Sequence, residues 1–471
     1  MTPMTRFLGA LVLAALVTVP AQSQETLLLR QPTLSAQHVA FAHGGDLWVA
    51  DRSGGDARRL TSTPAVEADP HFSPDGRMIA FTSNRSGLEA VYTVPVEGGD
   101  PTRLTWYPAS SQARGWSPDG ARVLYASSRE TAPVGYNRLW TVALEGGPSA
   151  LVPMPRATDG AYSPDGQRMI VDRVRRWDQE WRNYRGGQNT PLAILDLESM
   201  EEIYLPNERT TDIEPVWHGD TVYFVSDRDW TANVWSYDPA TGDLRQRTAF
   251  EDADVKALSA GPDVLAFERE GCLHTFDPAT DQTSTLSITV RGDFPWAASR
   301  WENVTGDVES VGLSPTGQRI VMAARGEVFT VPVENGDARN LTRSSDAADR
   351  AVTWSPDGRH VAWFSDAGGD GYGLMLAEQD GMSEPRRIDI GESVMAWEPV
   401  WSPDSEHIAF VDDDVRVRVL EVESGRIQTV DVGGTNIERG NMAPTWSPDS
   451  QWLAYATSAP NNFRRVMAWS A

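Results

Sequence analysis

A short motif, Ser-Pro-Asp-Gly, recurs along this chain and constrains its fold more than any other feature. Close copies occupy residues 73–76, 117–120, 163–166 and 355–358; variant copies occupy 314–317, 402–405 and 447–450. One long gap separates residues 163 and 314, and it holds degenerate copies near 217–220 and 261–263. Elsewhere successive motifs lie 41 to 47 residues apart. A period of this length is typical of proteins built from repeated blades.

The motif predicts a tight turn. Pro presets the backbone angle, Asp can accept a hydrogen bond from the backbone, and Gly takes the left-handed conformation that closes the turn. The motif at 73–76 is followed by β-rich runs at 78–81, 90–94 and 102–105. With the strand that precedes the turn, each repeat supplies four antiparallel strands, which is the composition of one propeller blade.

A large aromatic ring precedes most copies of the motif. These rings belong to Phe72, Trp116, Tyr162, Trp217, Trp354, Trp401 and Trp446. Because they recur at one fixed place in each blade, we expect them to pack between neighbouring sheets.

Counting repeats divides the chain into two arrays. A first repeat without the motif begins near residue 34, five more follow, and the period breaks at 291–306. Four further motifs start a second array. We therefore predict an all-β protein with a six-bladed β-propeller at residues 24–300, followed by an incomplete second β-propeller at residues 301–471. Since four sheets can hardly close a ring, we expect further blades beyond Ala471.

Residues 1–23 predict a cleaved signal peptide. Arg6 precedes an apolar run at 7–19, and the small residues Ala21 and Ser23 suit signal peptidase. The run is short for a membrane span. We therefore expect a periplasmic or secreted bacterial protein with no membrane insertion after signal removal. The single cysteine, Cys272, has no partner for an internal disulfide.

The formal net charge of −25 limits the partners of this chain. So many carboxylates repel phosphate backbones and anionic lipids, so we expect no nucleic acid and no membrane surface among its partners. Cationic or neutral partners fit the charge better.

Two segments carry a resemblance to a known family. The opening residues 27–30 with 46–48, and an insertion of aromatic and basic residues at 175–187 that ends in Tyr-Arg-Gly-Gly, resemble segments of tricorn protease homologues of the bacterial, secreted kind. The order of a six-bladed propeller followed by a second array also agrees with that family. In it, a seven-bladed propeller, a mixed domain, a PDZ domain and a catalytic core come next. The resemblance covers the whole mature chain.

This resemblance implies peptide hydrolysis by a serine assisted by histidine, in a large homo-oligomer. The family's catalytic residues lie in the C-terminal core, outside these 471 residues. We assign no catalytic residue, because no Gly-x-Ser-x-Gly motif occurs and the seven histidines lie in no zinc motif. No cofactor and no metal are expected. The expected function is to gate or steer peptides toward that core, and whether the chain itself is an enzyme stays open.

The resemblance also suggests one residue that contacts the peptide. In the family, two arginines just before the third blade's motif hold the peptide carboxylate. Arg114 is the nearest match here, and the second arginine is missing. The competing interpretation is an ordinary turn arginine surrounded by solvent.

Tyr184 and Arg185 are further candidates, because they lie in the insertion that resembles the family. Loops that project from a rigid scaffold often carry function. A role on the substrate path and a simple packing role are both open for this insertion.

Acidic residues before proline are a third candidate group. Asp69 and Glu214 precede Pro70 and Pro215, and Glu398 precedes Pro399 in the second array. We predict that these acids lie just before the innermost strand of a blade, at the mouth of the axial channel. Asp69 and Glu214 would there attract the positive ends of peptides. Alternatively, a carboxylate before proline simply begins a strand.

Asp366, Asp370 and the run Asp412, Asp413 and Asp414 show no calcium-binding spacing, so we interpret them as solvated turns.

The alternative function is a periplasmic binding scaffold that resembles the Tol-system propeller protein. That protein has a small α/β domain before its propeller, for which the first repeat here leaves no room after the signal.

Overall fold

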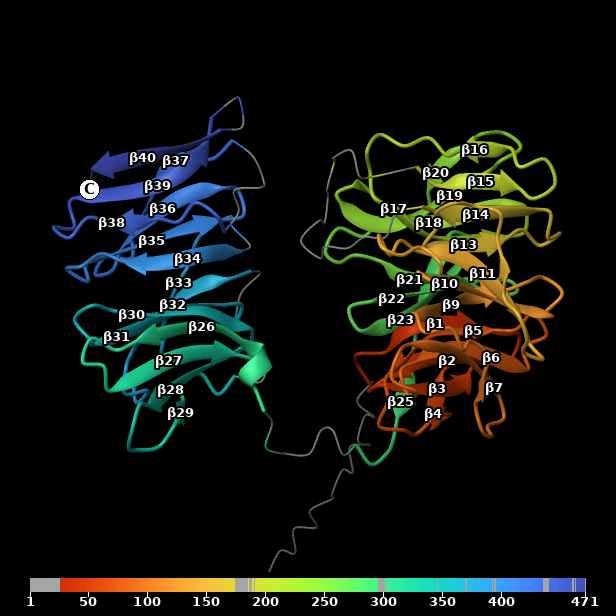
Figure 1. Ribbon diagram of the computed structural model, residues 1–471, viewed down its shortest axis with the longest axis horizontal. Coiled ribbons are helices and arrows are strands. Elements are labelled where there is room, and N and C mark those ends of the chain that lie inside the picture. Colours follow the sequence, from red (N-terminus) through yellow and green to blue (C-terminus); the bar gives the residue numbers. More distant parts are fainter. Residues whose placement is uncertain are drawn as a thin grey trace, which may run out of the picture. The chain divides into compact units, whose positions relative to one another are not determined.

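The computed structural model describes residues 26–173, 185, 189, 191–294, 301, 303–344, 346–368, 371–391, 393, 395–434, 440–459, 461 and 463–470. This part of the chain consists of β-strands and one short 3-10 helix, Thr305–Asp307. None of its helices is long and apolar enough to cross a membrane. The chain divides into two compact units, Met1–Ala298 and Ser299–Ala471 (Figure 1).

The described residues of the first unit form six sheets. Their strands are β1 (Arg30–Leu34), β2 (His38–His43), β3 (Asp46–Asp51), β4 (Gly55–Arg59), β5 (Glu67–Phe72), β6 (Met78–Ser83), β7 (Ala90–Pro95), β8 (Thr102–Arg103), β9 (Ser111–Trp116), β10 (Arg122–Ser127), β11 (Arg138–Ala143), β12 (Ala150–Leu151), β13 (Asp159–Tyr162), β14 (Arg168–Asp172), β15 (Ala193–Asp196), β16 (Glu202–Tyr204), β17 (Asp212–His218), β18 (Thr221–Asp229), β19 (Thr231–Tyr237), β20 (Leu244–Gln246), β21 (Lys256–Ala260), β22 (Leu265–Arg269), β23 (Cys272–Asp277), β24 (Gln282–Leu286) and β25 (Ile288–Val290). Each sheet contains four consecutive antiparallel strands, and β25 adds a fifth, parallel strand beside β4.

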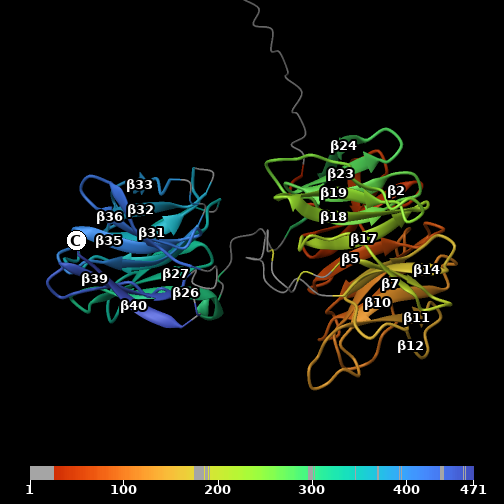
Figure 2. The same cartoon turned by 90° about the horizontal axis from the view of Figure 1, so that it is seen from above.

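The six sheets are packed as a closed ring. Apolar clusters join each sheet to the next, and a further cluster joins the sixth sheet to the first through Leu273, Leu29 and Trp48. Ile288 of β25 belongs to this last cluster. Because β25 follows the sixth sheet in sequence but pairs with β4 of the first, it fastens the two ends of the unit together (Figure 1). Figure 2 shows the unit turned by 90°.

The aromatic rings before the motif lie between sheets, as predicted. Trp116 packs in the cluster between the second and third sheets, and its Nε1 donates to the carbonyl oxygen of His71 at 2.9 Å. Trp217, Trp354 and Trp401 are buried in equivalent clusters. The ring therefore fills the same gap in each of these blades.

The motif forms the predicted turn, with one additional contact. Arg77 N donates to Asp75 Oδ1 at 3.1 Å, and Gly76 has a φ of +71°. The hydroxyl of Ser73 donates to Asp75 Oδ1 at 2.6 Å and accepts the N–H of Met78 at 2.9 Å. The serine thus ties the turn to the strand that follows it.

The second unit holds four sheets in the described residues. Its strands are β26 (Val308–Leu313), β27 (Arg319–Ala324), β28 (Glu327–Pro332), β29 (Arg339–Asn340), β30 (Asp349–Trp354), β31 (His360–Ser365), β32 (Gly373–Glu378), β33 (Arg386–Ile388), β34 (Ala396–Trp401), β35 (His407–Asp412), β36 (Arg416–Glu421), β37 (Ile427–Val432), β38 (Thr445–Trp446), β39 (Trp452–Ser458) and β40 (Arg464–Ser470). Three apolar clusters join these sheets in chain order. The predicted all-β, propeller-type architecture is therefore confirmed, whereas further blades beyond Ala471 stay a prediction.

The interpretation of the acidic run as a solvated turn is wrong for Asp412. This residue ends β35, and its side chain is fully buried against Arg416, Arg418 and Ser393. Asp414 next to it is exposed, as expected. Asp370 lies outside the described residues. In the described part of the chain, no group of three or more His, Cys, Asp or Glu side chains could hold a metal ion.

Candidate functional site

The inner strands of the first unit share a backbone irregularity at one position. In β1, β5, β17 and β21 the pairing register shifts at a β-bulge. Gln31, Asp69, Glu214 and Ala257 at these bulges have φ values between 50° and 53°. Strand β9 shifts its register at Arg114, between Ala113 and Gly115. A β-bulge changes the direction of a side chain, and here it does so at the same level in five neighbouring strands.

The bulges correct the prediction that Asp69 and Glu214 lie just before the innermost strands. Both lie within strands, at the third residue of β5 and of β17. Neither Asp69 nor Pro70 has a pairing partner on β6, since the register passes from Ala68 directly to His71. Proline lacks the N–H that a ladder needs, so it is accommodated where the ladder is interrupted. The acid–proline pair therefore marks a bulge and not the start of a strand.

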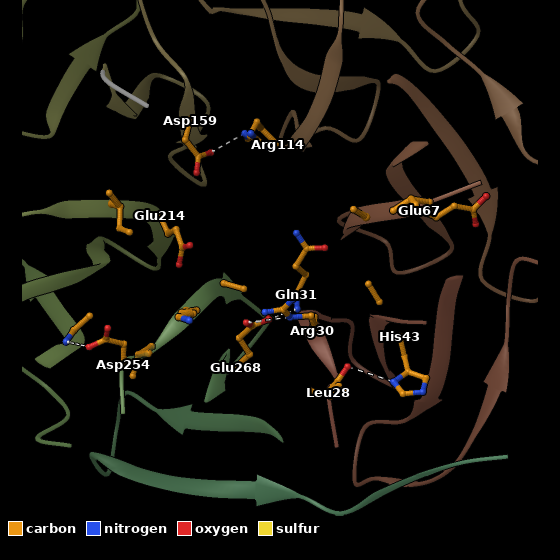
Figure 3. Close-up of a pocket in the computed structure, with 18 of the residues that line it drawn as sticks. Leu28, Arg30, Gln31, His43, Glu67, Arg114, Asp159, Glu214, Asp254 and Glu268 are labelled. Carbon is orange, nitrogen blue, oxygen red and sulfur yellow. Dashed lines mark hydrogen bonds and ion pairs between the residues drawn. The ribbon is translucent and has the colours of Figure 1, made fainter. Parts of the chain in front are cut away.

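Two cavities follow one another along the inner strands. The first has a volume of about 830 Å³ and is lined by the beginnings of the strands. The second has a volume of about 450 Å³ and is lined by their later residues. Both cavities are lined by Gln31, Arg114, Asp159, Glu214 and Ala257. We call these five residues together with Asp69 the axial ring; Figure 3 shows Gln31, Arg114, Asp159 and Glu214 around one opening.

Arg114 is held between two carboxylates of the axial ring. Its NH1 lies 3.6 Å from Asp69 Oδ2, and its Nε lies 3.7 Å from Asp159 Oδ1. Its NH2 donates to Gln112 Oε1 at 2.8 Å, and its Nε donates to the carbonyl oxygen of Thr158 at 3.1 Å. Burial lowers the pKa of Arg114, but the surrounding carboxylates, Asp69 first, outweigh it and raise this pKa overall. The interpretation of Arg114 as a solvent-screened turn arginine is wrong, because it lies within β9 and its side chain is only 20% exposed.

Both carboxylate oxygens of Asp69 accept hydrogen bonds from residues of the first unit. Its Oδ1 accepts the side-chain N–H of Gln31 at 2.9 Å, and its Oδ2 accepts the hydroxyl of Thr82 at 2.9 Å. Gln31 Oε1 accepts the N–H of Asp69 in return, at 3.0 Å. With Arg114 beside it, Asp69 also has a cationic partner within the protein.

Glu214 is in a different electrostatic situation. Its Oε2 accepts the backbone N–H of Leu258 at 3.1 Å, and the described residues place no Arg, Lys or His nitrogen within ion-pair distance of it. Burial, followed by the repulsion of Asp159 and Glu268, raises the pKa of the Glu214 carboxyl from 4.5 to about 7. The carboxyl therefore changes its charge near neutral pH.

We expect Glu214 to make the stability of the first unit depend on pH. The unfolded chain ionises this carboxyl above its ordinary pKa of 4.5, whereas the folded chain keeps it protonated up to about pH 7. The folded state therefore binds more protons in this range, and stability falls as the pH rises. Between about pH 5 and pH 9, the Glu214→Gln variant should lose about 2 kcal/mol less unfolding free energy than the wild type. This figure allows for the partial exposure of the Glu214 carboxyl. Calorimetric unfolding of both proteins checks this, and parallel pH profiles would contradict it.

Arg185 is the described member of the predicted pair in the insertion. Its NH1 lies 3.0 Å from Asp227 Oδ1, its NH2 donates to the carbonyl oxygen of Asp227 at 2.7 Å, and its guanidinium lies 4.8 Å from the ring centre of Trp230. Tyr184 lies outside the described residues. These contacts attach Arg185 to the fifth sheet, and a role of either residue on a substrate path stays a prediction.

Four residues of the site were not predicted from the sequence: Gln31, Asp159, Ala257 and Lys256. The first three complete the axial ring, and Lys256 lines the larger cavity. The repeat does hold a signal for the first three. Counting back four residues from Ser35, Ser73, Ser163, His218 and Gly261 gives Gln31, Asp69, Asp159, Glu214 and Ala257. In these five blades this position faces the axis. In the third blade the same count from Ser117 gives Ala113, and its neighbour Arg114 lines the cavities instead.

Comparisons with known proteins agree on one family. The model of the tricorn protease N-terminal beta propeller domain matches residues 26–282. The chain is 30% identical over 453 residues to tricorn protease homolog 1 of Streptomyces coelicolor, a match that covers 93% of this chain and 41% of that relative. It is 26% identical over 311 residues to tricorn protease of Thermoplasma acidophilum, covering 64% of this chain and 28% of that protein.

A solved structure shares the fold. The crystal structure of the tricorn protease matches 94% of this chain and 43% of its own length, with a TM-score of 0.51 and 19% sequence identity. The chain therefore spans less than half the length of these relatives.

Proposed function

Because the chain belongs to the tricorn protease family, we propose that its first unit admits peptides and steers them toward a serine-peptidase core outside these 471 residues. The observation that supports this most directly is the pair of cavities that share the axial ring. An extended peptide needs a passage with polar groups for its backbone and charged groups for its ends, and the axial ring supplies both. The propeller units would thus select and guide peptides without cleaving them.

The proposal includes the cell compartment and the assembly. Residues 1–23 support export to the periplasm or secretion, and the family resemblance supports a homo-oligomer of the full-length protein. Peptides are the proposed partners. The high negative charge favours peptides that are neutral or basic over acidic ones.

We expect the purified 471-residue chain to bind peptides without cleaving them. Binding of a fluorescently labelled peptide can be measured by anisotropy, and cleavage by a fluorogenic peptide of the same sequence. Saturable binding with no turnover is the expected result. Steady turnover that a serine-directed inhibitor abolishes would place the catalytic residues within this chain and contradict the proposal. Absence of any peptide binding would contradict it as well.

A further inference from the structure

Among the carboxylates of the axial ring and their neighbour Glu268, one has no guanidinium of the described residues beside it. Asp69 and Asp159 share Arg114. Glu268 Oε2 accepts the N–H of Gln31 at 2.9 Å, and Glu268 Oε1 lies 3.7 Å from Arg30 Nε. Each of these three carboxylates therefore has a guanidinium beside it. Glu214 is the carboxylate of this group that has no cation at ion-pair distance in the described part of the chain.

The position of Glu214 leaves its charge available to a ligand. It lines both cavities, so a molecule that occupies either one meets this carboxylate (Figure 3). A partly buried carboxylate without a counter-ion is costly to ionise, and a cationic ligand would remove that cost. Glu214 and such a ligand would form a charge-assisted hydrogen bond in a place that is partly shielded from water.

Glu214 also has a structural role, which it shares with Glu398. Glu398 occupies the same bulge position in β34 of the second unit, with a φ of 53°, and precedes Pro399 in the same way. Its carboxylate accepts the backbone N–H groups of Met442 and Ala443, just before β38 of the next sheet, at distances between 3.1 and 3.3 Å. Glu214 makes the equivalent contact to Leu258. One role of both glutamates is therefore to brace neighbouring sheets.

This brace does not need a negative charge. The carbonyl oxygen of a glutamine side chain can accept the same N–H, and Ala257 and Ala351 show that the bulge position itself accepts a side chain with no acceptor. A charge at position 214 is thus more than the fold requires. It is placed where Asp69, Asp159 and Glu268 each have a guanidinium beside them.

We propose that Glu214 binds a cationic side chain of a peptide in the channel, an arginine guanidinium or a lysine ammonium. This inference rests on the proposed function and adds the class of peptide that the first unit prefers. It also refines the sequence prediction that Asp69 and Glu214 act together. Asp69 already has Arg114 and Gln31 as partners, so we assign the preference to Glu214.

The preference for cationic peptides should depend on pH, because the protonated Glu214 carboxyl is uncharged. The raised pKa of its carboxyl, about 7, places this change within an accessible range. His71 does not add a cation at neutral pH, since burial lowers its pKa to about 4. The other Asp, Glu, Arg, Lys and His side chains that line these cavities are Arg30 on β1, His43 on β2, Glu67 and Asp69 on β5, Arg114 on β9, Asp159 on β13, Asp172 on β14, Lys256 on β21, Glu268 on β22 and Asp254 before β21.

The test compares two labelled peptides that differ in one side chain, arginine or the uncharged isostere citrulline. Binding to the full 471-residue chain is measured by anisotropy at low salt. We expect the wild type to bind the arginine peptide about tenfold more tightly at about pH 8.5, the usual size of one charge-assisted hydrogen bond. The Glu214→Gln variant should bind both peptides equally. The matched Glu398→Gln variant should keep the wild-type preference, because it makes the same change in the other unit.

Lowering the pH gives an independent readout. The wild-type preference should shrink at about pH 5.5, where Glu214 is protonated, and grow as the pH rises through about 7. A preference that persists in Glu214→Gln, or one that Glu398→Gln also abolishes, would overturn the inference. Equal binding of both peptides by the wild type would overturn it too while leaving the proposed function intact. Failure of the wild type to bind either peptide would instead refute the proposed function.

Discussion

Replacement of Asp412 by Asn is expected to destabilise the second unit by about 3–5 kcal/mol, the usual cost of breaking a buried ion pair. The carboxylate of Asp412 is fully buried and accepts hydrogen bonds from Arg416 Nε at 2.8 Å, from Arg418 NH1 at 2.9 Å and from the hydroxyl of Ser393 at 2.8 Å. Both guanidiniums are themselves mostly buried. An uncharged amide would leave them without their counter-ion. Urea unfolding of the full chain, followed by tryptophan fluorescence, measures the change.

Asp414 provides the matched control for this prediction. It lies two residues away and pairs with the same Arg416 at 3.0 Å, but its side chain is 60% exposed. Because exposed pairs contribute little, Asp414→Asn should cost less than about 1 kcal/mol. Equal losses for the two variants would show that the burial of Asp412 does not determine its contribution.

Replacement of Ile288 by Ala is expected to destabilise the first unit by about 2–5 kcal/mol, as for other large-to-small changes in a core. Ile288 is 1% exposed and packs with Leu29, Leu34 and Trp48 of the first sheet. It is part of β25, the strand that returns to β4 after the sixth sheet. The substitution therefore weakens the contact by which the ring is closed. Calorimetric unfolding of the full chain should show a lower transition temperature for the first unit.

Thr289 serves as the control for Ile288. It occupies the same strand and pairs with Asp56, but its side chain points to the opposite side and is only partly buried. Thr289→Ala should change stability by less than about 1 kcal/mol. If both substitutions had the same small effect, the packing of β25 would not be what holds the ends of the unit together.

The blades could be predicted from the sequence because they are local. The Ser-Pro-Asp-Gly turn, the strand runs around it and the ring before it lie within one repeat. Each follows from the backbone preferences of Pro and Gly or from the burial of an aromatic ring. The family could be inferred as well, and the match of residues 26–282 confirms it.

The contacts within the axial ring could not be predicted in the same way, because its residues come from different repeats. Asp69, Arg114 and Asp159 are far apart in the sequence, and their contacts depend on how three sheets pack. The bulges also shift the register by a residue, which reverses the direction of a side chain. The burial of Asp412 could not be predicted for another reason: its partners Arg416 and Ser393 belong to the same repeat, but they reach it from the neighbouring strand and from the loop before β34.

Lys256 permits a direct test of the central claim, that peptides bind in the channel of the first unit. It is the only lysine in the sequence, and it lines the larger cavity. A bulky amine-reactive reagent will therefore modify the wild type at Lys256 and at the N-terminus, but the Lys256→Arg variant at the N-terminus alone. Peptide binding to the full chain is then measured before and after modification. We predict that modification abolishes binding by the wild type and leaves binding by Lys256→Arg unchanged, whereas undiminished binding by the modified wild type would contradict the account.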